Sequence, residues 1–231
     1  MNLNKILQTY AINENEIGYK IHSTSNNDNT LEVYFEDIED KIIEKIRKAD
    51  LVFGCIAWLT NEKILKEMAK KHCIIVIQEE DFLRPDINFD GDKKQWKNKI
   101  YELYTKLEGE YLCAIIPDIN YCGGVNTGVR RFGFINKDKS PAFPRMHNKF
   151  IICAKYNTED HNITMTFNEV ITGSYNYTYN STNSIENIMC VKDEKIVNAY
   201  FENFKDILVC SVPLDWSAEW KPSPDDLRYG S

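Results

Sequence analysis

The chain has 231 residues, of which 43% are hydrophobic and 12% aromatic, so it can bury a full core and is not a disordered polypeptide. Its formal net charge of −7 argues against a general nucleic-acid binder with a cationic surface. No apolar run is long enough to cross a bilayer, and we expect no secretory signal. Seven scattered cysteines suit a reducing compartment, so a cytoplasmic location is expected.

The first part of the chain alternates between strand and helix patterns. Alternating or continuously apolar residues predict strands at Leu31–Phe35, Leu51–Trp58 and Cys73–Ile77. Between them, Asp37 is placed to cap a helix that runs to about Ala49, and Thr60 is expected to start a second helix. This order is typical of a sheet with helices packed on its faces.

The second part contains a helix, a long loop and further strands. In chain order the expected elements are a helix at Lys93–Leu107, a strand at Leu112–Ile116, a loop at Asn120–Pro144, a hairpin of Lys149–Ala154 with Ile163–Thr172, a strand at Asn187–Val191 and a helix at Glu194–Leu208. A loop of that length inside a compact domain usually has a function of its own.

These patterns predict an α/β fold with a mixed, mainly parallel sheet flanked by helices on both faces. We expect three regions along the chain. Residues 1–30 form a polar N-terminal extension, residues 31–212 form the catalytic domain, and residues 213–231 form an irregular tail.

Three short motifs gather the groups that phosphodiester chemistry needs. His147 and Lys149 come first, Gly173–Asn176 follows with a serine and an asparagine, and Glu186 precedes Asn187. Strand patterns flank each motif. The candidate catalytic residues are therefore His147, Lys149, Ser174, Asn176 and Glu186.

Each candidate has a distinct chemical task. A neutral imidazole at His147 attacks a phosphate anion without adding charge. Lys149 and Asn176 are expected to stabilise the nonbridging oxygens, and Ser174 to donate its hydroxyl or set the turn. Glu186 is expected to orient an imidazole by accepting from its far nitrogen. Such a site requires no metal and no cofactor.

Cationic residues surround the first motif. Between Val129 and Asn157 the chain has seven lysines and arginines against one aspartate. We therefore assign Arg130, Arg131 and Arg145 as substrate-binding residues. Gly173 joins them because a glycine lets the backbone approach a ligand closely.

The full pattern, His-x-Lys, Gly-Ser-x-Asn-x-Thr and Glu-Asn, resembles that of the phospholipase D superfamily, above all its small single-motif members, the bacterial endonucleases and mitochondrial phospholipase-D-like proteins. The resemblance covers roughly residues 30–208. It implies a phospholipase-D-like fold and cleavage through a phosphohistidine. One position departs, because Ala154 stands where the family has an aspartate.

One motif supplies one imidazole, whereas the mechanism uses one imidazole as nucleophile and another to protonate the leaving group. We therefore expect a C2 homodimer in which two copies of His147 face each other. Single-motif members of the family pair in this way.

The expected activity is that of an endonuclease that cleaves DNA or RNA. A phospholipid diesterase is the alternative, with Phe132, Phe134 and Phe143 near the site as an apolar lip. A noncatalytic module that binds phosphate or nucleic acid is a third interpretation, and a partner within a larger assembly that supplies specificity is a fourth. Asp86–Asp92 begins like a calcium loop but has Lys97 at its twelfth position, so no metal is expected.

Overall fold

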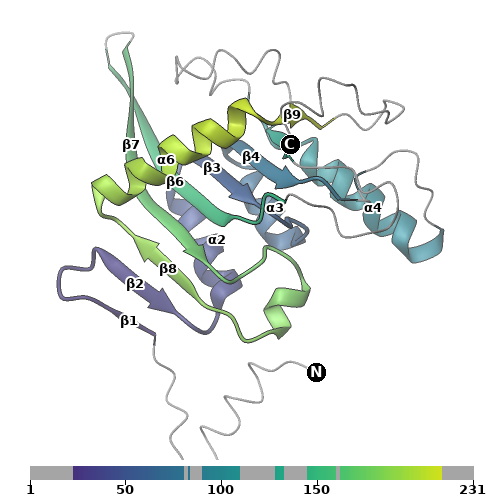
Figure 1. Cartoon of the computed structure of the whole chain (residues 1–231), viewed down its shortest axis with the longest axis horizontal. Helices are drawn as coiled ribbons and strands as arrows, with labels where there is room; N and C mark the ends of the chain where they lie inside the picture. Colours follow the sequence, from purple (N-terminus) through teal and green to yellow (C-terminus); the bar gives the residue numbers. More distant parts are fainter. Residues whose placement is uncertain are drawn as a thin grey trace, which may run out of the picture.

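The computed structural model describes residues 23–80, 83, 90–109, 128–132, 145–159 and 162–214. Within these ranges nine strands form one sheet in the order β1-β2-β8-β7-β6-β3-β4-β5-β9 (Figure 1). The strands are β1 (Thr24–Ser25), β2 (Leu31–Tyr34), β3 (Leu51–Ile56), β4 (His72–Gln78), β5 (Val129–Phe132), β6 (Lys149–Glu159), β7 (Asn162–Gly173), β8 (Ile188–Val191) and β9 (Val212–Pro213).

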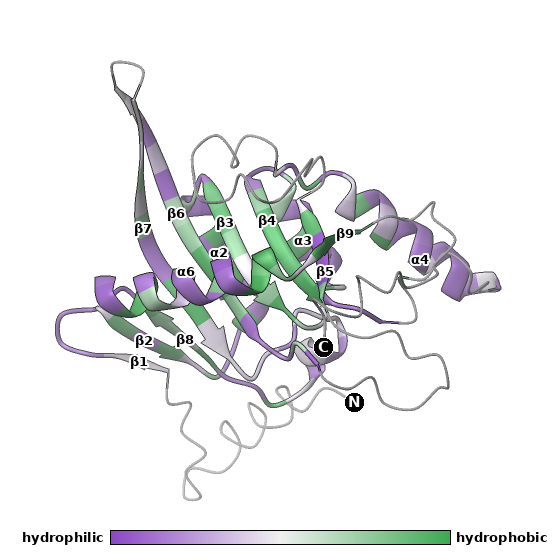
Figure 2. Ribbon diagram, turned by 45° about the horizontal axis from the view of Figure 1, so that its top comes forward, coloured by the Kyte–Doolittle hydropathy of each residue, from purple (hydrophilic) through white to green (hydrophobic). Residues whose placement is uncertain are grey.

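Helices cover both faces of this sheet, as expected. The helices are α2 (Ile38–Lys48), α3 (Glu62–Met68), α4 (Gly91–Tyr104) and α6 (Glu194–Val209), with a short 3-10 helix η3 (Asn180–Asn183). The helix α6 crosses one face, while α2 and α3 lie on the other (Figure 1). Each face has its own apolar core, and Figure 2 shows that the central strands β3 and β4 are the most hydrophobic.

The α/β class is confirmed, but the expectation of a mainly parallel sheet is wrong. Among the eight neighbouring pairs of described strands, β3–β4 and β4–β5 are parallel and the other six are antiparallel. The strands β6 and β7 form a tight hairpin, which can only be antiparallel. Together with β8 they lie between β2 and β3, so among the described strands a parallel pair with a helix between its members in the chain occurs at β3-α3-β4 and at β4-α4-β5.

Most predicted elements are confirmed within a few residues, with three local corrections. The strand β5 lies inside the segment that was expected to be a loop. Asn61, not Thr60, caps α3, accepting hydrogen bonds from the amides of Lys63 and Ile64. Asp37 precedes α2, but it adopts a left-handed conformation with φ of 49° and its side chain makes no capping bond.

Some expectations fall outside the described residues. They concern the strand at Leu112–Ile116, the aromatic residues Phe134 and Phe143, and the tail from residue 215 onward. Within the described ranges, none of the helices combines the length and the apolar character that crossing a bilayer requires.

A buried ion cluster ties α2 to the sheet. Lys45 on α2 donates to the carboxylates of Glu32 on β2 and Glu169 on β7, the latter at 2.8 Å. Lys192 adds a second cation beside Glu32 at 3.2 Å. Burial alone would raise the pKa of Glu32, but the hydrogen bond and charge of Lys45 hold it below the ordinary value. The cluster therefore fixes α2 by charge as well as by its apolar face.

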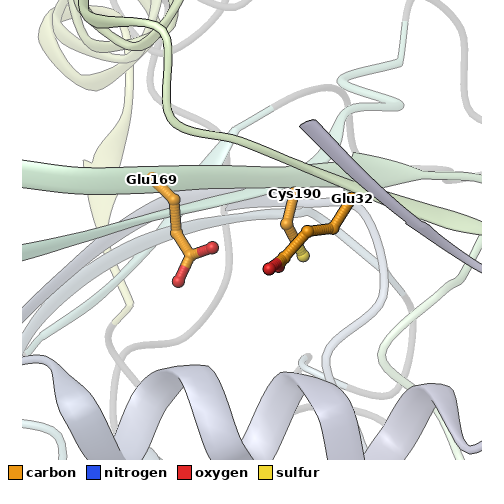
Figure 3. A group of neighbouring side chains, drawn as sticks. All are labelled: Glu32, Glu169 and Cys190. Atoms are coloured by element: carbon orange, nitrogen blue, oxygen red, sulfur yellow. The ribbon is translucent and has the colours of Figure 1, made fainter. Parts of the chain in front are cut away.

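The same cluster is the one group of metal-type ligands found among the described residues. Ligand atoms of Glu32, Glu169 and Cys190 lie within 4.8 Å of one another (Figure 3). However, the Lys45 ammonium already bonds both carboxylates, and the pKa of the buried Cys190 thiol is raised to about 12. The cations of this cluster are thus Lys45 and Lys192, and we assign the cluster to structure.

Replacing Lys45 with methionine should destabilise the fold strongly. The change leaves Glu32 without its nearer cation and Glu169 as a carboxylate whose side chain is only 8% exposed. Removing one partner of a buried pair costs about 3–5 kcal/mol. Urea unfolding would measure the loss.

The matched control is Lys48→Met on the same helix. Lys48 pairs with the exposed Glu44 at 2.6 Å, and such surface pairs contribute about 0–1 kcal/mol. Because the folded-state pKa of Glu32 is lowered, its share of stability is present above its unfolded pKa and is lost as the pH falls. Equal stability of the two variants would contradict a structural role for the cluster.

Candidate active site

The start of β6 lies where three strand ends meet. The strand β6 is antiparallel to β3 and β7, so Lys149 pairs with Ile56 near the end of β3, and Phe150 pairs with Thr172 near the end of β7. The segment before β6 is fixed by two hydrogen bonds. The amide of Met146 donates to Oε1 of the buried Gln78 at 2.7 Å, and the amide of Ala57 donates to the carbonyl of Asn148 at 2.8 Å.

His147 and Lys149 are in direct contact. The Lys149 ammonium lies 3.2 Å from Nδ1 and 3.4 Å from Nε2 of His147, and it donates to the His147 carbonyl at 3.1 Å. An ammonium can only donate, so a hydrogen bond to a ring nitrogen needs a lone pair on that nitrogen. The contact is therefore compatible with a neutral imidazole.

The electrostatics of the pair favour the same state. Burial, followed by the positive charges of Lys149 and Arg145, lowers the pKa of His147 below its ordinary value. Burial also lowers the pKa of Lys149, opposed by the nearby negative charge of Glu186. An imidazole with a lowered pKa is neutral and nucleophilic at pH 7.

Trp58 is a member of the site that the sequence did not single out. Its ring meets the His147 ring edge to face, with centroids 5.0 Å apart. The Lys149 ammonium lies 5.7 Å from the same indole centroid. Trp58 Nε1 in turn donates to Oε1 of Glu80 at 2.9 Å. Trp58 is the last residue of the apolar run Leu51–Trp58, which contains β3. No local motif marks it, so the sequence alone assigns it to the buried core.

Ser174 and Glu186 form a second group. The Ser174 hydroxyl donates to the Glu186 carboxylate and accepts from the Asn187 backbone amide at 3.1 Å. The Ser174 amide donates to the Asn187 carbonyl, also at 3.1 Å. Among the described residues, the Glu186 carboxylate therefore accepts a hydrogen bond from Ser174 and not from the imidazole of its own chain. Its action on an imidazole remains a prediction.

Gly173 makes this second group possible. A Cβ atom at this position would lie 2.2 Å from the Asn187 carbonyl oxygen and 2.8 Å from Cα of Ile188. The close approach seen here is thus between β7 and β8, whereas contact of Gly173 with a substrate is untested.

Asn176 lies in the turn after Gly173, between two buried tyrosines. The carbonyl of Tyr177 accepts from the amides of Thr60 and Asn61, both at 2.8 Å, which attaches this turn to the start of α3. Oδ1 of Asn176 is buried without a hydrogen-bond partner within the described part of the chain. A buried amide without a partner is costly, and a bound ligand would satisfy it.

The three predicted substrate arginines differ in their surroundings. Arg145 is exposed, two residues before His147. Arg130 is 4% exposed and donates to the hydroxyl and carbonyl of Ser211, both at 2.6 Å. Arg131 donates to the buried Glu79. Arg145 is thus the exposed one of the three, whereas Arg130 and Arg131 join β5 to neighbouring parts of the fold.

Ala154, at the position of the family aspartate, is fully buried in the apolar core beneath α6. Its carbonyl accepts from the amide of Asp50 at 2.9 Å. A main-chain hydrogen bond therefore helps to hold the backbone at this point.

The chain is similar to a viral protein in sequence and to bacterial proteins in structure. No family model matches the chain. Over 224 residues it is 30% identical to the uncharacterised protein L381 of Acanthamoeba polyphaga mimivirus, covering 90% of this chain and 75% of that protein. The structure is similar to NucT from Helicobacter pylori, with a TM-score of 0.46 and 16% identity, covering 79% of this chain and 98% of that one.

It is also similar to Nuc from Salmonella typhimurium, a phospholipase D family member, with a TM-score of 0.44 and 16% identity, covering 77% of this chain and 92% of that one. Both likenesses are at the level of the fold, and the resemblance of the motifs to this superfamily is taken up again with the proposed function.

Replacing Lys149 with methionine should raise the pKa of His147. The substitution removes the nearer of the two cations that disfavour the imidazolium. NMR titration of the His147 ring would measure the change, with Lys155→Met, an exposed position farther along β6, as control. An unchanged His147 midpoint in Lys149→Met would contradict the contact.

Replacing Gly173 with alanine should push β7 and β8 apart. The added methyl group overlaps backbone atoms, which cannot swing away as a side chain would. The expected loss is about 1–3 kcal/mol in urea unfolding, together with a shifted Asn187 amide resonance. Thr172→Ala at the preceding, half-buried position is the control and should leave that resonance in place.

Proposed function

We propose that this chain, which belongs to the same family as the mimivirus protein L381, is a metal-independent phosphodiesterase that takes a phosphoryl group onto His147. The observation that carries the proposal is the contact between the Lys149 ammonium and a neutral His147 imidazole at 3.2 Å. Asn176, with its unsatisfied buried oxygen, and the Ser174–Glu186 pair lie on the neighbouring turn.

The proposed reaction has two steps. A ring nitrogen of His147 attacks phosphorus, a nitrogen–phosphorus bond forms, and the bond to one ester oxygen breaks. An acid donates a proton to the departing alkoxide. Water then attacks the phosphohistidine and gives up a proton to the group that acted as the acid in the first step. This step releases the phosphate monoester and the free imidazole. Lys149 stabilises the charge that gathers on the nonbridging oxygens in both steps.

The acid of the first step is proposed to be His147 of a second copy of the chain, which acts as the imidazolium and, once deprotonated, accepts the proton of water in the second step. Within the described residues, the histidine that contacts Lys149 is His147, and no second histidine is placed beside it. His72 lies at the start of β4 and packs against Tyr156, far along the strands from the site. A homodimer supplies the missing imidazole and makes both sites equivalent.

A nucleic acid is the favoured substrate. The exposed Arg145 stands two residues before His147 and provides a cation for a neighbouring phosphate of a polymer. The phospholipid alternative needs an apolar lip. Of its three proposed residues, Phe132 is described, and it packs against the core beneath α6. A noncatalytic phosphate-binding module uses the same contacts without turnover, and a larger assembly that supplies specificity is compatible with each alternative.

The test is cleavage by wild type and His147→Ala, offered single-stranded DNA, RNA and anionic phospholipid vesicles in parallel. Loss of the nucleophile should reduce turnover by about a thousandfold or more, and EDTA should have no effect. When the enzyme is incubated briefly with labelled substrate and the reaction is then quenched, an acid-labile phosphohistidine should be trapped on the wild type only.

The control is His72→Ala, which should keep its activity. Mixing wild type with excess His147→Ala should lower the activity more than dilution does, because mixed dimers lack one imidazole. Binding without turnover would favour the noncatalytic module, and strong inhibition by EDTA would contradict the mechanism.

A further inference from the structure

The indole of Trp58 contacts both of the side chains on which the proposed chemistry depends. Its ring packs edge to face against His147 at a centroid distance of 5.0 Å and an interplanar angle of 82°. The Lys149 ammonium lies 5.7 Å from its centroid, which is within the range of a cation–π interaction. Trp58 itself is partly buried.

The indole is held from its far side by Glu80. Trp58 follows β3 by two residues, and Glu80 follows β4 by two residues. Because β3 and β4 are parallel, both residues leave the sheet at the same edge. There Nε1 of Trp58 donates to Oε1 of Glu80 at 2.9 Å. A hydrogen bond to a carboxylate is stronger than one between neutral groups.

We propose that Trp58 is a positioning residue, locked by Glu80, that keeps the His147 ring and the Lys149 ammonium in their mutual geometry. This inference rests on the proposed function, because positioning matters only if His147 accepts a phosphoryl group. The arrangement of His147, Lys149 and Trp58 can nevertheless be measured without turnover.

The physical need for such a residue follows from the mobility of the pair. The Lys149 side chain has four rotatable bonds, and fixing such a chain in one conformation is entropically costly. The imidazole has two torsions and lies in an exposed position. A rigid, partly buried ring that touches both groups restricts them before a substrate arrives. Misplacement of reacting atoms by about 1 Å can slow a reaction about a hundredfold.

Three variants separate the contacts. Trp58→Phe keeps an aromatic ring but removes the hydrogen bond to Glu80. Trp58→Leu removes the ring as well. Glu80→Ala leaves the indole in place without its anchor, and it also serves if Trp58→Leu fails to fold. The matched control is Trp96→Phe on α4, a tryptophan 37% exposed and outside the site.

The first measurement is NMR of the His147 ring. In the wild type the indole ring current should shift the His147 Cε1 proton, and the nitrogen shifts should report a single dominant neutral tautomer. We expect the proton shift to be reduced in Trp58→Phe and Glu80→Ala and lost in Trp58→Leu, with mixed tautomers in Trp58→Leu. Trp96→Phe should match the wild type.

The second measurement is turnover of the substrate found active above. We expect kcat to fall about tenfold in Trp58→Leu and less in Trp58→Phe, with KM changed less than about twofold. Trp58→Phe and Glu80→Ala should be non-additive, because each breaks the same hydrogen bond.

Contrary outcomes are distinct. Unchanged His147 resonances in Trp58→Leu and Glu80→Ala would overturn the proposal whether or not the protein has activity. A rise in KM with kcat intact would make Trp58 a substrate-stacking residue instead and would also overturn it. An inactive wild type with the expected NMR changes would contradict the proposed function but not the positioning.

Discussion

The Lys149 ammonium lies against the His147 imidazole, and this contact decides what the rest of the site can do. A positive charge at 3.2 Å from a ring nitrogen disfavours protonation of the ring, in the same direction as its burial. In the proposed reaction, the cation that binds the phosphate would therefore also favour a neutral attacking group. The same proposal has the ammonium turn to the phosphate oxygens when an anionic substrate enters, which frees the lone pair for attack.

The scaffold makes this contact through strand direction. The strand β6 runs against both β3 and β7, so its first residues lie beside their last ones. Side chains from the motifs then meet at one edge although the motifs are far apart in the chain. Gln78 and Gly173 complete the arrangement, the first by holding Met146 and the second by admitting Asn187. In a mainly parallel sheet, the start of β6 would have lain at the opposite edge from the end of β3.

The sequence predicted the elements better than their order in space. Apolar periodicity located α2, β3, β4, β6 and α6 because it reports burial, which is a local property. Apolar periodicity does not report which strands are neighbours in the sheet. No local sequence pattern indicates that β6, β7 and β8 lie between β2 and β3. Trp58 was missed for the same reason, since its role depends on Glu80 and His147, which are close only in the folded chain.

Ala154 stands where the motif pattern that this sequence resembles has an aspartate. The position is fully buried in apolar surroundings beneath α6, where an unpaired carboxylate would be costly. The nearest acidic residue of β7 in the core, Glu169, packs on the α2 side and is neutralised by Lys45. It is not a substitute for the aspartate. The main-chain bond from Asp50 and the anchors at Gln78 and Trp58 hold the segment, so the site depends on its neighbouring strands and not on a carboxylate within β6.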